Sequence, residues 1–181
     1  MLMVNKLRYL LLVLTIFIGG CSTSIEGEHY VTMTPQLDLF RFFDSQIKGW
    51  GIVQDRSGNV IQRFIVDIKG SVKQNELVLH ETFSYQLGEG PTTRTWRIER
   101  GQNGEYIGRA NDITAPARGT SFGNAFNFEY KMDLPVGDDI YKVAFDDWFF
   151  AMDEQTIMNR SYIKKFGLVM AEVTIFMQQV D

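Results

Sequence analysis

The stretch Ala125-Phe-Asn-Phe-Glu-Tyr-Lys-Met-Asp-Leu134 decides the fold of this chain. Apolar and polar side chains alternate along it: Phe126, Phe128, Tyr130, Met132 and Leu134 form one set, and Asn127, Glu129, Lys131 and Asp133 form the other. A period of two predicts a β-strand with one buried and one wet face. We therefore expect the five apolar side chains to point inward.

The same period recurs along most of the chain. It predicts further strands at 45–55, 60–72, 76–87, 92–100, 105–110, 140–150, 156–166 and 168–178. Segments rich in Gly, Asn, Ser and Pro separate several of them and predict turns at 56–59, 73–75, 88–91, 101–104 and 135–138. One short helix is predicted at 35–43, with Thr34 as its N-cap and Pro35 as its first helical residue.

About nine or ten consecutive strands with short connections predict one all-β domain over residues 35–181. Such a meander must close or stack to hide its apolar face and its edges. We predict an up-and-down antiparallel β-barrel with one short N-terminal helix, and a two-sheet sandwich is the alternative. Charged side chains opposite the apolar face suit water better than lipid, which argues against an outer-membrane porin.

The composition excludes several classes of protein. Of 181 residues, 45% are hydrophobic, 22% are charged and only 4 are Pro, which is typical of a globular domain and not of a disordered one. The net charge of −4 would repel nucleic-acid phosphates, so no nucleic-acid partner is expected. A single cysteine allows neither an intrachain disulfide nor a cysteine-based metal cluster.

The amino terminus has the layout of a secretory signal at residues 1–20: two basic residues, then an apolar run at 9–18, then two glycines. As a helix the apolar run would rise only about 15 Å, too short to cross a bilayer. Ile18-Gly19-Gly20-Cys21 resembles the bacterial lipobox, which implies cleavage before Cys21 and lipid on its sulfur. Ser22 then favours the outer membrane, facing the periplasm, over the inner membrane. Residues 21–34 are predicted to be a lipidated tether.

Charged residues on the apolar face are candidates for a binding site. Glu81 falls in phase with Phe83 and Tyr85, and Arg94 with Trp96 on the next predicted strand. If 88–91 is a turn, Glu81 and Arg94 lie a few rungs apart on one face. Either they form a buried ion pair, or they anchor the polar end of a ligand whose apolar part contacts Tyr85 and Trp96. The planar fork of Arg94 would suit a carboxylate or a phosphate.

Two further polar positions stand out. Asp146 and Asp147 are adjacent in a strand and must face opposite sides, so one of them points inward or lies at a rim. We take Asp147 as a site candidate, with bulge or rim structure as the alternative. Arg160 shares a face with Tyr162, and we expect it to stack on a Trp such as Trp50 or to cap the barrel.

The usual catalytic constellations are missing from the sequence. His29 falls in the predicted tether and His80 on a predicted exposed face, and there is no HExxH, G-x-S-x-G or P-loop motif. No catalytic residue, metal ligand or cofactor is therefore predicted. An enzyme acting on lipid ranks behind two other classes. One is a barrel that binds a fatty acyl or other amphipathic molecule, and the other is a solid barrel with a protein partner.

Several short motifs carry a family resemblance: Gly108-Arg-Ala-Asn-Asp112, Gly123-Asn-Ala125, Phe145-Asp-Asp-Trp148, Asn159-Arg-Ser161 and Lys165-Phe-Gly167. Together they are similar to an uncharacterised proteobacterial lipoprotein family known as domain of unknown function 3833. The resemblance implies no established activity. The architecture also resembles that of lipocalins. Gly49 directly precedes Trp50 here, however, where lipocalins have Gly-x-Trp.

Overall fold

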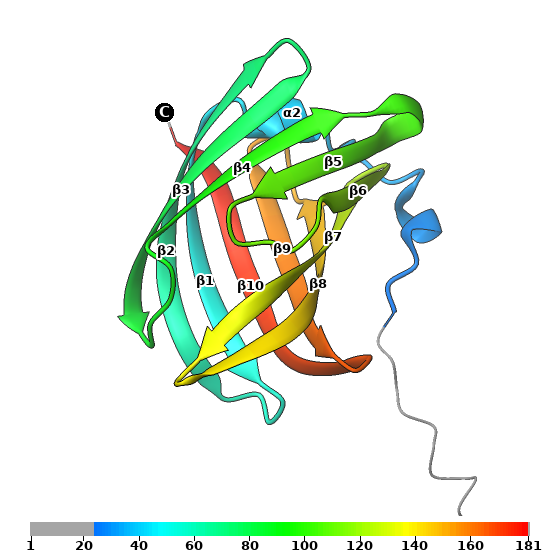
Figure 1. Cartoon of the computed structure of the whole chain (residues 1–181). Coiled ribbons are helices and arrows are strands. Elements are labelled where there is room, and N and C mark those ends of the chain that lie inside the picture. The colour runs from blue at the N-terminus through cyan, green and yellow to red at the C-terminus, as the bar shows by residue number, and fades with distance from the viewer. Residues whose placement is uncertain (1–23, 181) are drawn as a thin grey trace, which may run out of the picture.

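Ten antiparallel strands close into a barrel in the computed structural model, which describes residues 24–180 (Figure 1). Each strand pairs with its neighbours in the sequence, and β1 pairs with β10 to complete the ring. The predicted up-and-down barrel is therefore confirmed over the sandwich. The strands are β1 Gln46–Asp55, β2 Val60–Lys73, β3 Glu76–Leu87, β4 Thr93–Arg100, β5 Glu105–Ala110, β6 Ala117–Phe122, β7 Ala125–Val136, β8 Asp139–Ala151, β9 Thr156–Lys165 and β10 Leu168–Val180.

The predicted inward face of β7 is the buried one. Phe126, Phe128, Tyr130 and Met132 are buried, while the intervening Glu129 is exposed. Aromatic rings continue across the interior, where Trp96 on β4 lies 5.3 Å from Phe128 and 5.2 Å from Tyr130 between ring centroids. The alternation along the sequence therefore does mark the barrel interior.

Strand β6 was not predicted from the sequence, because its inward positions carry no large apolar side chain. Ala117 is fully buried, and a Cβ added to Gly119 would lie 2.4 Å from the ring of Phe126 and 3.0 Å from that of Phe128. Large rings from β7 fill the space that β6 leaves. The small inward residues of β6 are a packing requirement that a periodicity of hydrophobic residues does not reveal.

The predicted helix at 35–43 is shorter than expected. Helix α2 spans Leu39–Phe43, and its N-cap is Asp38, whose carboxylate accepts from the backbone N–H groups of Phe40 and Arg41. The assignment of Thr34 and Pro35 to the helix start was wrong because Asp38 satisfies the free N–H groups four residues later. Four of the five α2 side chains are buried, so the helix closes one end of the barrel (Figure 1): Leu39, Phe40, Phe42 and Phe43.

Helix α2 rests directly on the barrel wall. A Cβ at Gly70 on β2 would lie only 1.6 Å from the carbonyl oxygen of Phe43, so only glycine allows this approach. The end opposite α2 is ringed by the β1–β2, β3–β4, β7–β8 and β9–β10 hairpins, and no element of residues 24–180 covers it (Figure 1). We refer to the two as the closed end and the open end.

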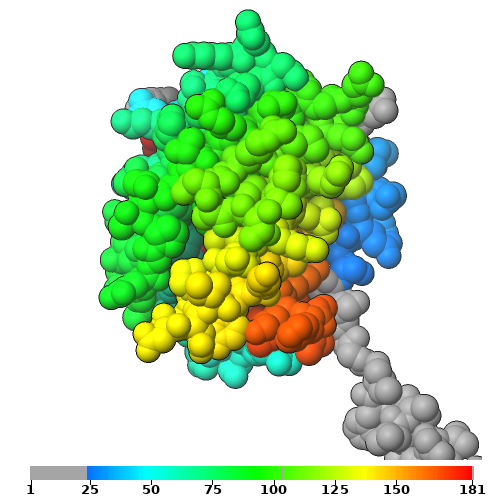
Figure 2. All heavy atoms as spheres, viewed as in Figure 1, coloured from blue at the N-terminus to red at the C-terminus, as the bar shows by residue number. Residues whose placement is uncertain are grey.

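The segment before α2 packs on the outside of the barrel. It contains the 3-10 turn η2 (Gly27–Tyr30), and a second such turn, η3 (Gln102–Gly104), links β4 to β5. The Tyr30 ring lies 6.2 Å from Trp148 and 5.2 Å from Phe150, both on the outer face of β8. Figure 2 shows the segment, in blue, against the side of the barrel. Residues 27–30 belong to the interval predicted as a tether. The predicted signal at 1–20 and the predicted lipidation site Cys21 lie outside the described residues.

Candidate functional site

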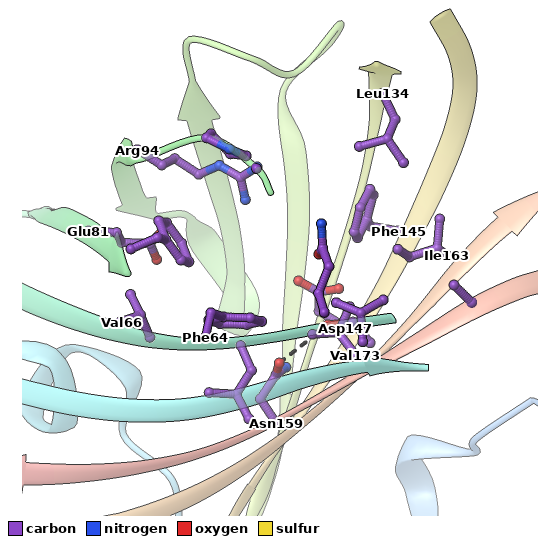
Figure 3. A pocket seen from close by; sticks show the side chains of 18 of the residues that line it. Phe64, Val66, Glu81, Arg94, Leu134, Phe145, Asp147, Asn159, Ile163 and Val173 are labelled. Carbon is purple, nitrogen blue, oxygen red and sulfur yellow. Dashed lines mark hydrogen bonds between the residues drawn. The ribbon is translucent and has the colours of Figure 1, made fainter. Parts of the chain in front are cut away.

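The barrel encloses a cavity of about 920 Å³ that reaches from α2 to the open end. This volume lies within the range of sites that bind small molecules, about 300–1,000 Å³. Leu39 and Phe43 of α2 form its floor, and most of its wall is aliphatic or aromatic. Inside the barrel, the polar side chains of its lining come from β3, β4, β8 and β9: Glu81, Arg94, Asp147, Asn159 and Ser161, of which Figure 3 labels the first four. Gln62, Glu89 and Lys165 line the cavity at the open end.

Glu81 and Arg94 lie opposite each other on β3 and β4. The register pairs them directly, which is closer than the few rungs expected from the sequence. Both point into the cavity (Figure 3). Their neighbours behave as predicted, since Trp96 is buried and lines the cavity together with Tyr85. The guanidinium carbon of Arg94 lies 5.9 Å from the centroid of the Trp96 ring.

The ion-pair partner of Arg94 is Asp112 and not Glu81. The Arg94 Nε and NH2 groups donate to one oxygen of Asp112 over 2.8 and 2.6 Å. The side chains of this pair are only 15% and 25% exposed. The Glu81–Arg94 ion pair considered from the sequence was therefore wrong. Asp112 follows β5 in a connecting segment, and its family motif was the only sequence signal that drew attention to it.

The carboxyl of Glu81 is left in an apolar setting. Burial raises its pKa to about 7, although the positive charge of Arg94 opposes this shift. At pH values below about 7 this side chain therefore carries a proton. A protonated carboxyl both donates and accepts hydrogen bonds, so it suits an uncharged polar group.

Asp147 is the second buried carboxyl of the cavity. As predicted, it and Asp146 face opposite sides: Asp147 lines the cavity, and Asp146 accepts a 2.8 Å hydrogen bond from Asn127 and pairs with Lys164. Burial raises the pKa of Asp147 to about 7. Its Oδ1 atom is buried and has no hydrogen-bond partner among the described residues. Hydrogen bonds from the hydroxyls of Ser161 and Tyr130 to the Asp147 carboxyl oppose this rise in its pKa.

Arg160, which the sequence placed with the interior candidates, lies on the outer face. Its guanidinium donates to Glu172 on β10 over 2.6 Å and lies 5.0 Å from the centroid of the Tyr162 ring. The cavity is lined instead by Asn159 and Ser161, which are out of phase with it. Trp50, its predicted stacking partner, pairs with Phe176 at 6.0 Å on the outside of β1 and β10.

Among the described residues, no group of three or more His, Cys, Asp and Glu side chains is arranged to hold a metal ion. His80 is exposed, and its Nδ1 lies 3.1 Å from the hydroxyl of Thr95. Asn159 and Ser161 were not predicted as site residues. Ser161 donates to Asn159 over 3.3 Å beneath Asp147, so β9 contributes a small polar patch to the middle of the cavity (Figure 3).

Comparison with known proteins identifies the family. The model of a family described as protein of unknown function (DUF3833) matches residues 15–179. The chain belongs to this family. A search of curated proteins finds no match.

A search of solved structures finds a protein with a similar fold. The S-type phycobiliprotein lyase CPES from Guillardia theta matches with a TM-score of 0.57 at 9% identity. The match covers 78% of this chain and 90% of the lyase chain. At this identity the similarity concerns the fold alone.

Proposed function

We propose that the barrel binds a small amphipathic molecule with an acyl chain and an uncharged polar group. The observation that carries the proposal is the cavity itself: about 920 Å³, apolar along most of its wall, with two protonatable carboxyls halfway along it. An acyl chain would lie against the aromatic wall, and the polar group would contact Glu81 and Asp147. A cavity of this size argues against the alternative of a solid structural barrel.

The charges inside the barrel favour an uncharged polar group over a free carboxylate. Arg94 is already neutralised by Asp112, which occupies two of its N–H groups. Lys165, the other cation of the lining, lies at the end of β9 at the open end. Beside Glu81 and Asp147, an anion would be repelled above pH 7 by both carboxylates. We therefore propose that the polar group of the ligand forms hydrogen bonds with Glu81 and Asp147, in place of the carboxylate or phosphate on Arg94 that the sequence suggested.

Displacement of the uncharged fluorescent probe N-phenyl-1-naphthylamine tests this proposal. Hexadecanol should displace the probe at least tenfold more effectively than hexadecanoate at pH 8. Val173→Trp, on the cavity wall of β10, should abolish probe binding, while Thr174→Trp adds the same bulk to the next residue, which does not line the cavity. Absence of saturable probe binding by the wild type, or equal binding by both variants, would contradict the proposal.

We also propose that Cys21 carries lipid and holds the barrel at the periplasmic face of the outer membrane. The lipobox-like sequence at 18–21 and Ser22 support this placement. Labelled palmitate should enter the wild type and not Cys21→Ala, and density-gradient fractions should place the protein with outer-membrane markers. Labelling that survives the substitution would rule out Cys21 as the site.

A further inference from the structure

The open end of the barrel carries exposed apolar side chains on all four of its hairpins. Of the fourteen exposed large apolar residues within 24–180, eight lie on these hairpins and their adjoining strand ends. We call the most prominent of them the apolar rim: Ile61, Leu87, Val136, Ile140, Phe166 and Leu168. Phe166 is 94% exposed and Ile140 71%. Exposed apolar residues gathered at one place on a protein are typical of an interaction surface.

Phe166 occupies its place at a conformational cost. Lys165 pairs with Leu168, so Phe166 and Gly167 form a two-residue turn, with φ values of +53° and +78°. Two positive φ values define the type I′ turn, where Asn-Gly is the favoured sequence. A bulky aromatic residue is disfavoured in this left-handed conformation. The chain therefore places a fully exposed aromatic ring at a position where turn geometry favours Asn.

The charges near the rim almost balance. The hairpins at the open end carry Arg56, Lys142 and Lys165 against Asp55, Glu89, Asp138 and Asp139. The Lys165 ammonium lies 4.1 Å from the centroid of the Tyr141 ring and 5.4 Å from that of Phe166. These are cation–π contacts, and aromatic residues beside a lysine are typical of the anchors that proteins place at a membrane interface.

We propose that the open end of the barrel docks on the surface of a lipid bilayer, with the apolar rim inserted at the level of the head groups. The rim residues lie on separate hairpin tips around an opening, so together they offer a ring to a planar, deformable surface. The opening leads into the cavity, and a bilayer is where a molecule with an acyl chain is dissolved. This part of the argument rests on the proposed function.

The path of the N-terminal segment supports the same orientation. From α2 at the closed end, the chain before it runs down the side of the barrel toward the open end (Figure 1). Cys21 precedes Ser24, the first described residue, by three residues, which can span at most about 10 Å. A lipid on Cys21 would therefore hold the side of the barrel near the membrane and leave the rim within its reach.

Cosedimentation with phosphatidylcholine vesicles tests the docking without the lipid anchor. The chain from residue 21 with Cys21→Ala keeps every contact described above, since all of them lie within residues 24–180. We expect it to bind the vesicles, and we expect Phe166→Asn together with Ile140→Ser to weaken partitioning at least tenfold. Because the rim charges almost balance, raising NaCl from 0.05 to 0.5 M should change binding by less than twofold.

Met152→Ser is the matched control, because Met152 is 60% exposed on the β8–β9 turn at the closed end. It should bind vesicles like the parent chain. Equal loss in Met152→Ser, unchanged binding of the rim variant, or no binding by the parent chain would each overturn the proposal. The rim variant should still bind N-phenyl-1-naphthylamine in solution. Vesicle binding without any probe binding would refute the proposed ligand and leave the docking intact.

Discussion

The two ends of the barrel differ in whether their apolar side chains are covered. At the closed end, α2 buries four apolar side chains, and the β2–β3 turn at that end presents Gln74 and Asn75 to solvent. At the open end no described element covers the cavity, and the β9–β10 turn presents Phe166. Gln74 and Phe166 share the left-handed conformation, with φ values of +56° and +53°. A positive φ is thus adopted by a polar residue at one end and by an exposed aromatic residue at the other.

Among the described residues, the turns at the closed end expose one large apolar side chain, Met152, whereas each of the four hairpins at the open end exposes at least one. Stability accounts for the four buried side chains of α2 at the closed end, because they are out of water. Stability does not account for Phe166, which buries almost no surface. The following predictions test the contrast, starting with the largest effect.

Removing a side chain from the closed end should destabilise the barrel strongly. Phe42 of α2 is 4% exposed and contacts Phe43 with ring centroids 5.0 Å apart. Phe42→Ala should lower the free energy of unfolding by about 3–5 kcal/mol, because it leaves a cavity as well as losing burial. Phe166→Ala at the open end should change it by less than about 0.5 kcal/mol. Urea denaturation of both variants measures the contrast, and similar losses at the two ends would remove it.

Breaking the Arg94–Asp112 ion pair in the barrel wall should cause the second-largest loss of stability. Arg94→Met leaves Asp112 largely buried without its partner, and Oδ1 of Asp112 already lacks a hydrogen bond among the described residues. We expect a loss of about 3 kcal/mol, at the low end for buried pairs because both side chains are partly exposed. Replacing both residues, as Arg94→Met with Asp112→Leu, should recover most of this loss. If Glu81→Gln rescued Arg94→Met better than Asp112→Leu did, Glu81 and not Asp112 would be the true partner.

The middle of the cavity should make stability depend on pH. The pKa values of Glu81 and Asp147 rise to about 7 on folding from ordinary values of 4.5 and 3.8. Between these limits the folded chain holds protons that the unfolded chain has lost. The stabilisation is therefore complete below about pH 4 and is lost as pH rises to about 7.

Each of the two carboxyls should contribute a change on the order of 2 kcal/mol between pH 5 and pH 8. Thermal melts at several pH values should show a smaller fall in stability for Glu81→Gln with Asp147→Asn than for the wild type. Phe42→Ala, at the closed end, should lower the whole curve without changing its slope. A double variant that keeps the wild-type slope would place the two carboxyls in contact with water.

The sequence predicted most of the barrel because one face of most strands alternates cleanly. It did not reveal β6, whose inward residues are small. The sequence analysis also grouped Arg160 with the interior candidates, because its neighbours on the outer face are apolar. Trp148 and Phe150 on the outer face of β8 are covered by the N-terminal segment, and Tyr162 on β9 is buried as well. With apolar residues on both faces, the alternation no longer distinguishes inside from outside. The Arg94–Asp112 pair joins residues 18 positions apart through a connecting segment, which no strand register predicts.

The smallest effect is the most informative one for the open end. Phe166→Asn replaces an aromatic residue in a left-handed turn with the residue that the turn favours, so we expect it to raise the free energy of unfolding by about 0.5–1 kcal/mol. Gln74→Asn, at the positive-φ residue of the β2–β3 turn at the closed end, should leave vesicle binding unchanged. It is therefore the control for a substitution to Asn at a positive φ that removes no apolar side chain from the surface. If Phe166→Asn stabilises the barrel and weakens its binding to vesicles, the aromatic ring is kept at the open end for a contact outside the barrel and not for folding. A Phe166→Asn chain that is less stable than the wild type would instead mean that the ring supports the hairpin itself.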